Sequence, residues 1–250
     1  MKYIIVSDFH IKFKENEDDI NRRHLVEAFL NSLVGNVDGL ILAGDIFDLW
    51  VEWGKVIIKN YFNILRIFDN LKQSGTRLVF IKGNHDFWFS DFLKKEIGFE
   101  VYEKYFAEEI NGKKLFISHG DMYTKNDLRY SVFSRLVRTK TAQSIFRLLH
   151  PDIALSFGNK LSRTSRTRKN SQKLLEIKEK CLIATAEKLS KDYDLIVFGH
   201  THNPMRKDFD SSVYINCGDW INHNSFCYFD EDKIELQDYV NTKILKSEDF

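Results

Sequence analysis

The sequence predicts a layered α/β fold, and three observations support this prediction. Short apolar runs, such as Leu40-Ile41-Leu42-Ala43, suit strands that are buried on both faces. Segments with apolar residues at helical spacing alternate with these runs. The chain has 250 residues, 43% of them hydrophobic, and is long enough to bury one sizeable core. We therefore expect a single domain over residues 1–250.

Strands and helices are expected to alternate along most of the chain. The segment 21–33 places Leu25, Phe29 and Leu33 on one helical face and stops near Gly35, which suits a C-cap. Near the end of the chain we expect antiparallel strands, followed by a polar tail at residues 230–250. In chain order, the expected elements are a strand at 3–6, helix at 21–33, strand at 40–43, helix at 56–71, and strands at 78–81, 114–117, 195–198, 213–216 and 226–229.

Residues 124–173 interrupt this alternation, because they show no strand pattern. We interpret them as a basic and apolar helical insertion that forms a lid over an anionic, partly apolar ligand. The alternative is a solvated helical hairpin whose Lys and Arg stems cover apolar surface. The only acidic residues of the segment are Asp127 and Asp152. Its basic residues are Lys125, Arg129, Arg135, Arg138, Lys140, Arg147, Lys160, Arg163, Arg166, Arg168, Lys169 and Lys173.

Composition argues against several classes of protein. The net charge is only +1, so no global field favours nucleic acid, and we expect no nucleic-acid partner. Cys181, Cys217 and Cys227 form no Cys-x-x-Cys pair, which indicates a reducing compartment. No apolar run reaches the ~18 residues of a membrane span, and the first strand is too short for a signal-peptide core. We therefore expect a cytoplasmic protein.

Residues that can bind metal ions follow five of the expected strands. A single Gly-Asp after a strand is more often only a turn, so it is the recurrence of such residues after five strands that favours a metal site. In Asp8-x-His10 and His200-x-His202, alternate residues of an extended chain point to the same side and can reach one ion or two adjacent ions. Imidazoles with carboxylate and amide oxygens suit Mn²⁺, Fe²⁺ or Zn²⁺ and favour a catalytic site. The candidate ligands are Asp8, His10, Asp45, Asn84, His119, His200 and His202, whereas His24, His150 and His223 are interpreted as ordinary histidines.

The set and order of these motifs resemble the calcineurin-like metallophosphoesterase superfamily. The matching blocks are Asp8-x-His10, Gly44-Asp45-x-x-Asp48, Gly83-Asn84-His85-Asp86, Ser118-His119 and Gly199-His200-x-His202. The resemblance implies an α/β fold built as a two-sheet β-sandwich flanked by helices, with two divalent metal ions at the strand ends. By motif position, Asp8, His10 and His202 would hold the first ion, Asn84, His119 and His200 the second, and Asp45 would bridge them.

Two adjacent ions would make the chain a metal-dependent hydrolase. They can share a water, lower its pKa towards neutrality and align the bridging hydroxide with a phosphorus atom. His85 would stabilise the phosphoryl oxygens or protonate the leaving oxygen, and Asp86 would fix the tautomer of His85 through a hydrogen bond. These two residues are the candidate catalytic residues. Asp48 and Asp121 are expected to cap loops or to orient ligands.

Within the superfamily, the sequence most resembles the UDP-2,3-diacylglucosamine hydrolases (pyrophosphatases) of lipid A biosynthesis. The resemblance is carried by the block 44–50 ending in Trp50, by the run from His119 to Arg138, and by Asn170-x-x-Lys173. It implies hydrolysis of a UDP-linked diacylated glucosamine to UMP and 2,3-diacylglucosamine 1-phosphate, with two Mn²⁺ ions. The diphosphate suits the basic residues of the insertion, and the acyl chains suit its apolar ones. The implied substrate contacts are Asn84, His85, Asp127, Ser165, Asn170, Lys173, His200 and His202.

Two positions depart from the best-known branch of that family. His85 stands where that branch has Arg, and Arg166 stands where it has Ser, one residue from Ser165. Three other functions stay open: a broad-specificity phosphodiesterase or nucleotide hydrolase, a DNA-processing nuclease that uses the insertion as a clamp, and a non-catalytic metal-binding scaffold. The presence of His85 argues against the scaffold. A peripheral position at the inner face of a membrane, through the lid, is a further expectation for this cytoplasmic protein.

Overall fold

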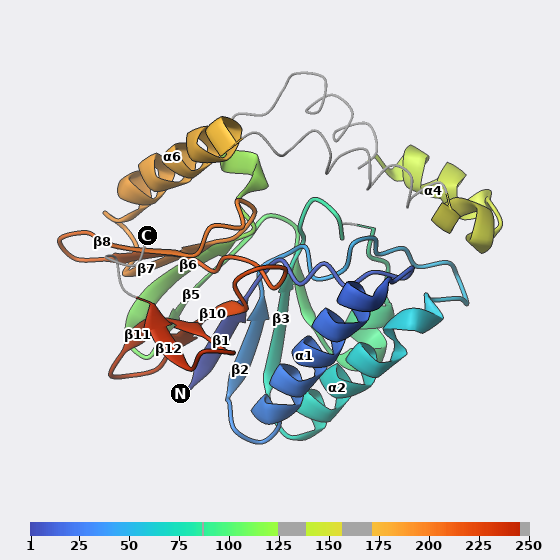
Figure 1. Cartoon of the computed structure of the whole chain (residues 1–250), viewed down its shortest axis with the longest axis horizontal. Helices are drawn as coiled ribbons and strands as arrows, with labels where there is room; N and C mark the ends of the chain where they lie inside the picture. Colours follow the sequence, from blue (N-terminus) through green and yellow to red (C-terminus); the bar gives the residue numbers. More distant parts are fainter. Residues whose placement is uncertain (87, 125–138, 157–171, 246–250) are drawn as a thin grey trace.

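The computed structural model of the chain describes residues 1–86, 88–124, 139–156 and 172–245. In this part of the chain two mixed β-sheets pack face to face, and helices cover their outer faces (Figure 1). The expectation of a two-sheet β-sandwich flanked by helices is therefore confirmed.

The described residues form a seven-stranded and a five-stranded sheet. In spatial order the first consists of β12 (Lys243–Leu245), β11 (Ile234–Asp238), β10 (Ser225–Phe229), β1 (Tyr3–Val6), β2 (Gly39–Leu42), β3 (Arg77–Ile81) and β4 (Glu100–Tyr102). The second consists of β5 (Tyr105–Ile110), β6 (Lys113–Ser118), β7 (Leu195–Phe198), β9 (Val213–Asn216) and β8 (Met205–Asp208). Within the first sheet β1, β2 and β3 run parallel, and within the second β6, β7 and β9 run parallel. The candidate ligands follow the carboxyl ends of these parallel strands, where α/β sheets bind ligands.

Helices pack on both outer faces of the sandwich. α1 and α2 lie side by side against the first sheet, and α6 lies against the second (Figure 1). α1 begins at a capping box, in which the Asn16 side chain accepts from the Asp19 N–H and the Asp19 carboxylate accepts from the Asn16 N–H. The helices are α1 (Glu17–Leu33), the 3₁₀ turn η1 (Lys59–Tyr61), α2 (Phe62–Gln73), the π-turn η2 (Leu93–Ile97), the 3₁₀ turn η3 (Asp121–Tyr123), α4 (Lys140–Leu148) and α6 (Gln172–Leu189).

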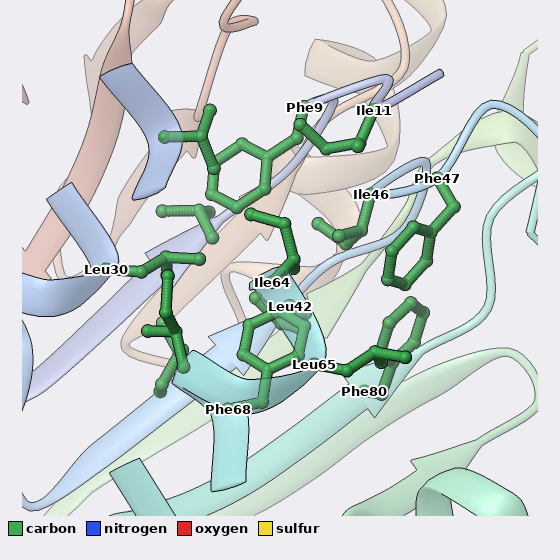
Figure 2. Packing of buried hydrophobic residues seen from close by; sticks show 14 of the residues in the cluster. Phe9, Ile11, Leu30, Leu42, Ile46, Phe47, Ile64, Leu65, Phe68 and Phe80 are labelled. Atoms are coloured by element: carbon green, nitrogen blue, oxygen red, sulfur yellow. The ribbon is translucent and has the colours of Figure 1, made fainter. Parts of the chain in front are cut away.

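The apolar strands are buried on both faces, as their continuous hydrophobic runs predict. In β1, Ile4 and Val6 pack towards α1 and α2, whereas Ile5 packs towards the second sheet. Figure 2 shows the first of these clusters, in which Leu42 of β2 lies among side chains of α2 such as Phe68. Because both faces of the central strands are covered, their positions and those of the turns that follow are tightly fixed.

The outermost strands were not predicted, because their sequences are polar. β4, β5, β8 and β12 stand at the edges of the two sheets, and most of their side chains are partly or fully exposed. Charged residues on edge strands discourage pairing with other chains, but they also remove the apolar pattern by which a strand is recognised. The expected helix at 56–71 begins later, with η1 and α2.

The described part of the expected polar tail, residues 230–245, is not a simple tail but part of the first sheet. This segment contains β11 and β12, which extend the first sheet beyond β10. The two strands that precede the tail, β9 and β10, are present as expected and each has an antiparallel neighbour, but they belong to different sheets. The connection between them therefore crosses from one sheet to the other at the edge that carries the candidate ligands.

Part of the insertion at 124–173 lies outside the described residues. The described portion is helical, with α4 followed by a helical turn at 151–156. The ring of Phe146 on α4 packs against Trp88 and Trp53, at centroid distances of 4.5 and 6.5 Å. Ile145 and Leu148 on the same helix are exposed. Among the described helices, none combines the length and the apolar character needed to cross a bilayer.

Candidate metal centre

The turns after the parallel strands hold the candidate ligands in an unusual backbone conformation. Among the described residues, eight residues other than glycine have a positive φ, and five of these are candidate ligands. They are Asp8 (φ 56°), His10 (φ 48°), Asp45 (φ 55°), His200 (φ 70°) and His202 (φ 60°). A positive φ is disfavoured for such residues by roughly 1–3 kcal/mol each and persists where the surrounding structure imposes it, typically at functional sites. Sharp turns therefore direct side chains from separate strands into one region.

Two glycines allow these turns to approach one another. A Cβ atom on Gly83 would overlap the backbone nitrogen and the carboxylate of Asp45. A Cβ atom on Gly199 would overlap Ser7 and the carboxylate of Asp8. The glycines of the Gly-Asn and Gly-His motifs are thus required because backbone passes directly against a candidate ligand.

Asp8, His10 and His202 form the first cluster of donor atoms. The Nε2 atoms of His10 and His202 lie 3.3 Å apart. Oδ1 of Asp8 lies 3.3 Å from Nε2 of His202 and 3.5 Å from Nε2 of His10. These separations lie within or just above the roughly 3.0–3.4 Å expected between ligands that surround one ion at bond lengths of about 2.1 Å.

Asn84, His119 and His200 come together beside this cluster. Oδ1 of Asn84 lies 3.2 Å from Nε2 of His119. The rings of His119 and His200 stand edge to face, with their centroids 5.2 Å apart. Asp45 lies between the two clusters, because its Oδ2 atom is 3.3 Å from Nε2 of His119 and 3.8 Å from Nε2 of His10. The structure thus brings all seven candidate ligands together.

Asp8 and Asp45 each use their two oxygens differently. Oδ2 of Asp8 accepts a hydrogen bond from the N–H of His200 (3.0 Å), and Oδ1 faces the histidine rings. Oδ1 of Asp45 accepts from the N–H of His85 (2.8 Å), and Oδ2 faces the rings of both clusters. One oxygen of each carboxylate therefore ties two motifs together, while the other is available as a ligand.

The donor set fits divalent metal ions. Oδ1 of Asp8 is fully buried and has no hydrogen-bond partner, although it lies among imidazole nitrogens. A buried carboxylate oxygen without a donor is costly, whereas a bound cation would satisfy it together with the lone pairs of the neighbouring rings. Mixed imidazole, carboxylate and amide ligands are those of a catalytic rather than a structural site.

Hydrogen bonds orient two of the histidine rings. Nδ1 of His119 lies 3.0 Å from the carbonyl oxygen of Ala43, so this nitrogen carries the proton in the neutral ring and leaves Nε2 free to bind a metal. Nδ1 of His202 lies 3.0 Å from Oδ2 of Asp219, whose other oxygen lies 2.9 Å from Nδ1 of His223. Asp219 belongs to the crossing segment between β9 and β10 and is absent from the predicted site. His223, which was expected to be an ordinary histidine, contacts the carboxylate of Asp219.

The carboxylate beside His85 differs from the one expected. Asp86 does not orient the His85 ring in the structure. Its two oxygens instead accept hydrogen bonds from four backbone N–H groups, those of Gly83, Asp45, Ile46 and Phe47. Asp48 is the residue next to the ring, with its carbonyl oxygen 3.2 Å and its Oδ1 atom 3.5 Å from Nδ1 of His85. Asp86 therefore holds two motif loops together, and Asp48 orients His85.

α6 contributes two buried charged residues that were not predicted. Glu179 accepts hydrogen bonds from Thr201, from the Tyr214 hydroxyl (2.7 Å) and from Asn216 (2.9 Å), and so fixes the turn between His200 and His202. Nζ of Lys178 lies 3.5 Å from Nε2 of His200. A signal was available in the sequence, because Lys178 precedes the buried Leu182 and Ala186 at intervals of four residues and so lies on the apolar face of the helix.

The remaining predicted substrate contacts lie in or next to the insertion. Asp127, Ser165 and Asn170 are outside the described residues. Lys173 is described and lies exposed in the first turn of α6. Their assignment as substrate contacts stays a prediction.

Opposite charges set the protonation of the ring nitrogens in the metal-free protein. Burial opposes protonation of His119, but the charge and hydrogen bond of Asp45 outweigh it and raise the pKa of His119 to about 10. Burial likewise opposes protonation of His202, whereas Asp8 and Asp219 raise its pKa to about 9. The pKa of Asp45 is lowered well below its usual value: burial alone would raise it, but the charges of His119 and His85 outweigh that effect.

Proton release should accompany metal binding. Because the folded pKa of His119 (about 10) lies above its ordinary 6.5, the pair with Asp45 stabilises the metal-free protein fully below pH 6.5, and this stabilisation is lost as the pH rises through 10. A metal ion requires the neutral ring and competes with this proton. We expect the apparent affinity for Mn²⁺ to rise by up to about tenfold per pH unit for each proton released, between about pH 7 and pH 9. Calorimetric Mn²⁺ titrations over this range measure it, and a flat profile would contradict the assignment of these rings as ligands.

The fold and the cluster of metal-binding side chains are those of the metal-dependent phosphoesterases. The sequence pattern of the calcineurin-like phosphoesterase family matches residues 1–204. The chain therefore belongs to the calcineurin-like phosphoesterase family and is a metal-dependent hydrolase.

The chain is also similar to individual proteins of known sequence or structure. The chain is 27% identical to the UDP-2,3-diacylglucosamine hydrolase of Porphyromonas gingivalis over 253 aligned positions, which cover 94% of this chain and 97% of that protein. It is 26% identical to the protein of the same name from Haemophilus influenzae strain Rd, over 90% of this chain and 94% of that protein. A structure of Vps29 complexed with Zn²⁺ from Entamoeba histolytica is 14% identical with a TM-score of 0.49, over 98% of this chain and 96% of that one.

Proposed function

We propose that the protein hydrolyses UDP-2,3-diacylglucosamine to UMP and 2,3-diacylglucosamine 1-phosphate, in lipid A biosynthesis. The observation that carries this proposal is the similarity to hydrolases of that name over 94% of the chain, a span that includes the insertion as well as the metal centre. Membership of the phosphoesterase family supports phosphoester or phosphoanhydride chemistry in general, and the relatives favour this substrate within it.

The residues of the centre support roles in this reaction. Asp8, His10 and His202 would bind one divalent ion, Asn84, His119 and His200 a second, and Asp45 would bridge them. Two such ions, most suitably Mn²⁺, would supply an activated water and neutralise charge on the phosphoryl group. His85, which lies 3.2–3.5 Å from the carbonyl oxygen and carboxylate of Asp48, would donate a hydrogen bond to a phosphoryl or leaving oxygen. Asn84 and His200 would also contact the phosphate.

The insertion supports a lipid-linked substrate. We propose that residues 124–173 form a lid within a single domain and that Asp127, Ser165, Asn170 and Lys173 contact the polar part of the substrate. α4 is anchored through Phe146 and exposes Ile145 (60%) and Leu148 (85%). Such apolar exposure suits acyl chains and the inner face of a membrane, where we propose that this cytoplasmic protein works.

Release of UMP tests the proposal. Purified protein with Mn²⁺ is expected to release UMP from UDP-2,3-diacylglucosamine, and the His85→Ala variant to lower kcat by about 10²–10⁴-fold. The matched control is His24→Ala on α1, which should leave kcat unchanged. Turnover is followed by chromatography of the nucleotide product.

A parallel assay with bis-p-nitrophenyl phosphate separates the alternatives. Cleavage of this simple diester without UMP release from the UDP-lipid would identify a broad-specificity phosphodiesterase. Equal rates in wild type and His85→Ala would remove the role given to His85.

A further inference from the structure

His202 is more exposed than the other histidines of the metal centre. Of its side chain 32% is exposed, against 3% for His10 and 1% for His119. Its ring stacks on the ring of His10, with the centroids 5.0 Å apart. Stacking limits the position of the ring, but it does not select which of the two ring nitrogens carries the proton. A directed hydrogen bond is therefore needed to prepare His202 for a metal ion.

Asp219 provides this hydrogen bond. The residue is buried, and its Oδ2 atom lies 3.0 Å from Nδ1 of His202. The other oxygen, Oδ1, accepts the backbone N–H groups of Asn222 (3.0 Å) and His223 (3.2 Å) and lies 2.9 Å from Nδ1 of His223. The side-chain amide of Asn222 is a more distant neighbour, 3.4 Å from Oδ2. These contacts fix the carboxylate, so that one oxygen anchors the turn and the other faces His202.

Asp219 belongs to a segment that is itself tied to Asp8. The N–H of Trp220, the next residue, donates to the carbonyl oxygen of Asp8 (3.2 Å). The indole of Trp220 is buried, packs on Phe29 with the ring centroids 4.6 Å apart, and donates to the carbonyl oxygen of Ser225 (3.0 Å). The core beneath the first sheet therefore fixes the place of Asp219 relative to Asp8.

A carboxylate in this position selects one tautomer of the His202 ring. An ionised carboxylate only accepts hydrogen bonds, so the neutral ring places its proton on Nδ1. Nε2 then keeps its lone pair, and this nitrogen lies 3.3 Å from Oδ1 of Asp8 and 3.3 Å from Nε2 of His10. Partners that orient a ligating histidine in this way typically contribute about 10–100-fold to metal affinity.

We propose that Asp219 is a positioning residue that sets the affinity of the first metal ion, because it holds the exposed ring of His202 in the tautomer and orientation that this ion requires. The inference rests on the proposed function in that it takes Asp8, His10 and His202 as the ligands of one ion, but it does not depend on the substrate. It gives the segment that crosses between the two sheets a direct part in metal binding.

Binding of Mn²⁺ to the Asp219→Asn variant tests this inference. Because three donors converge on Oδ1, the oxygen of asparagine should take that place, and its NH₂ group should face Nδ1 of His202. A metal ion at Nε2 requires a proton on Nδ1, so two donors would then oppose one another. We expect the Kd for one of the Mn²⁺ ions, measured by calorimetry, to rise by about 10–100-fold. Circular dichroism checks that the variant is folded.

Two further variants separate a positioning role from a structural one. Asp219→Ala removes the acceptor of the turn as well as the partner of His202. If Asp219 only shaped the turn, Asp219→Asn would bind Mn²⁺ like wild type and only Asp219→Ala would bind it weakly. In His202→Ala, which lacks the ligand, the added Asp219→Asn substitution should change the Kd for Mn²⁺ by less than about threefold, because its effect passes through His202.

Asp210→Asn is the matched control, because it makes the same change of charge at an exposed position between β8 and β9. Its Kd for Mn²⁺ should equal that of wild type. The inference is overturned if Asp219→Asn binds Mn²⁺ like wild type, or if this substitution weakens binding equally with and without His202.

These outcomes are separable from that of the UMP assay. Mn²⁺ affinity that depends on Asp219 through His202, in a protein that releases no UMP from the UDP-lipid, would uphold the role of Asp219 and reject the proposed substrate. UMP release with a Mn²⁺ affinity that is independent of Asp219 would do the reverse. A wild-type protein that binds no Mn²⁺ would overturn both.

Discussion

Asp45→Asn should lose hydrolytic activity by at least about 10³-fold, about 4 kcal/mol of transition-state stabilisation. In the structure, Oδ2 of Asp45 lies between His119 and His10, whereas Oδ1 accepts the N–H of His85. Asparagine can keep the hydrogen bond to His85 through its carbonyl oxygen, but it replaces the negative oxygen between the clusters by a neutral group. The variant should therefore retain its fold and lose the bridging ligand.

Three measurements check this expectation together. Steady-state phosphodiester hydrolysis measures the rate, elemental analysis measures bound metal per chain, and circular dichroism measures the fold. Asp232→Asn, which alters an exposed acidic residue far along the sequence from the motifs, is the control. Wild-type rates in Asp45→Asn would rule out a bridging carboxylate, whereas loss of the circular dichroism signal would show that Asp45 is needed for folding.

Asp86→Ala should produce the largest loss of stability among single substitutions near the site, about 3–5 kcal/mol in the free energy of unfolding. The fully buried carboxylate accepts hydrogen bonds from four backbone N–H groups, at distances from 2.7 to 3.1 Å. Alanine would leave these donors buried and without this acceptor. The loops after β2 and β3 would then separate, and Asp45 would be displaced with them.

Urea unfolding of the metal-free protein measures this effect without interference from bound ions. Asp192→Ala, at an exposed position after α6, should change the free energy of unfolding by less than about 0.5 kcal/mol. If Asp86→Ala unfolds at the same urea concentration as wild type but fails to hydrolyse phosphodiesters, then Asp86 acts in catalysis, as its place beside His85 in the sequence first suggested, rather than as a clamp.

The sequence alone was sufficient to predict the central strands and the metal-binding residues that follow them. β1, β2, β3, β6 and β7 are apolar throughout because both of their faces are covered, and this pattern is visible without knowledge of the partners. Glycines such as Gly83 and Gly199 stand in the motifs because the backbone there passes directly against Asp45 and Asp8, so these positions can be recognised in the sequence. The apolar runs predicted a layered α/β fold with the seven candidate ligands at its strand ends, and the family resemblance implied the two-sheet sandwich.

Only the tertiary structure decided which residues support those ligands. The sequence favoured Asp86 as the partner of His85, whereas the structure places Asp48 beside the ring, because the choice depends on how two separate loops pack. Asp219 reaches His202 from a sheet crossing, and no local pattern records this contact. Helical spacing places Lys178 on the apolar face of α6, but it does not show that His200 is its neighbour. The polar edge strands could not be predicted from the sequence either, because their membership of a sheet depends on pairing with a neighbouring strand. Periodicity reports whether a segment is buried, whereas hydrogen-bond partners far apart in the chain are fixed only when the whole fold has formed.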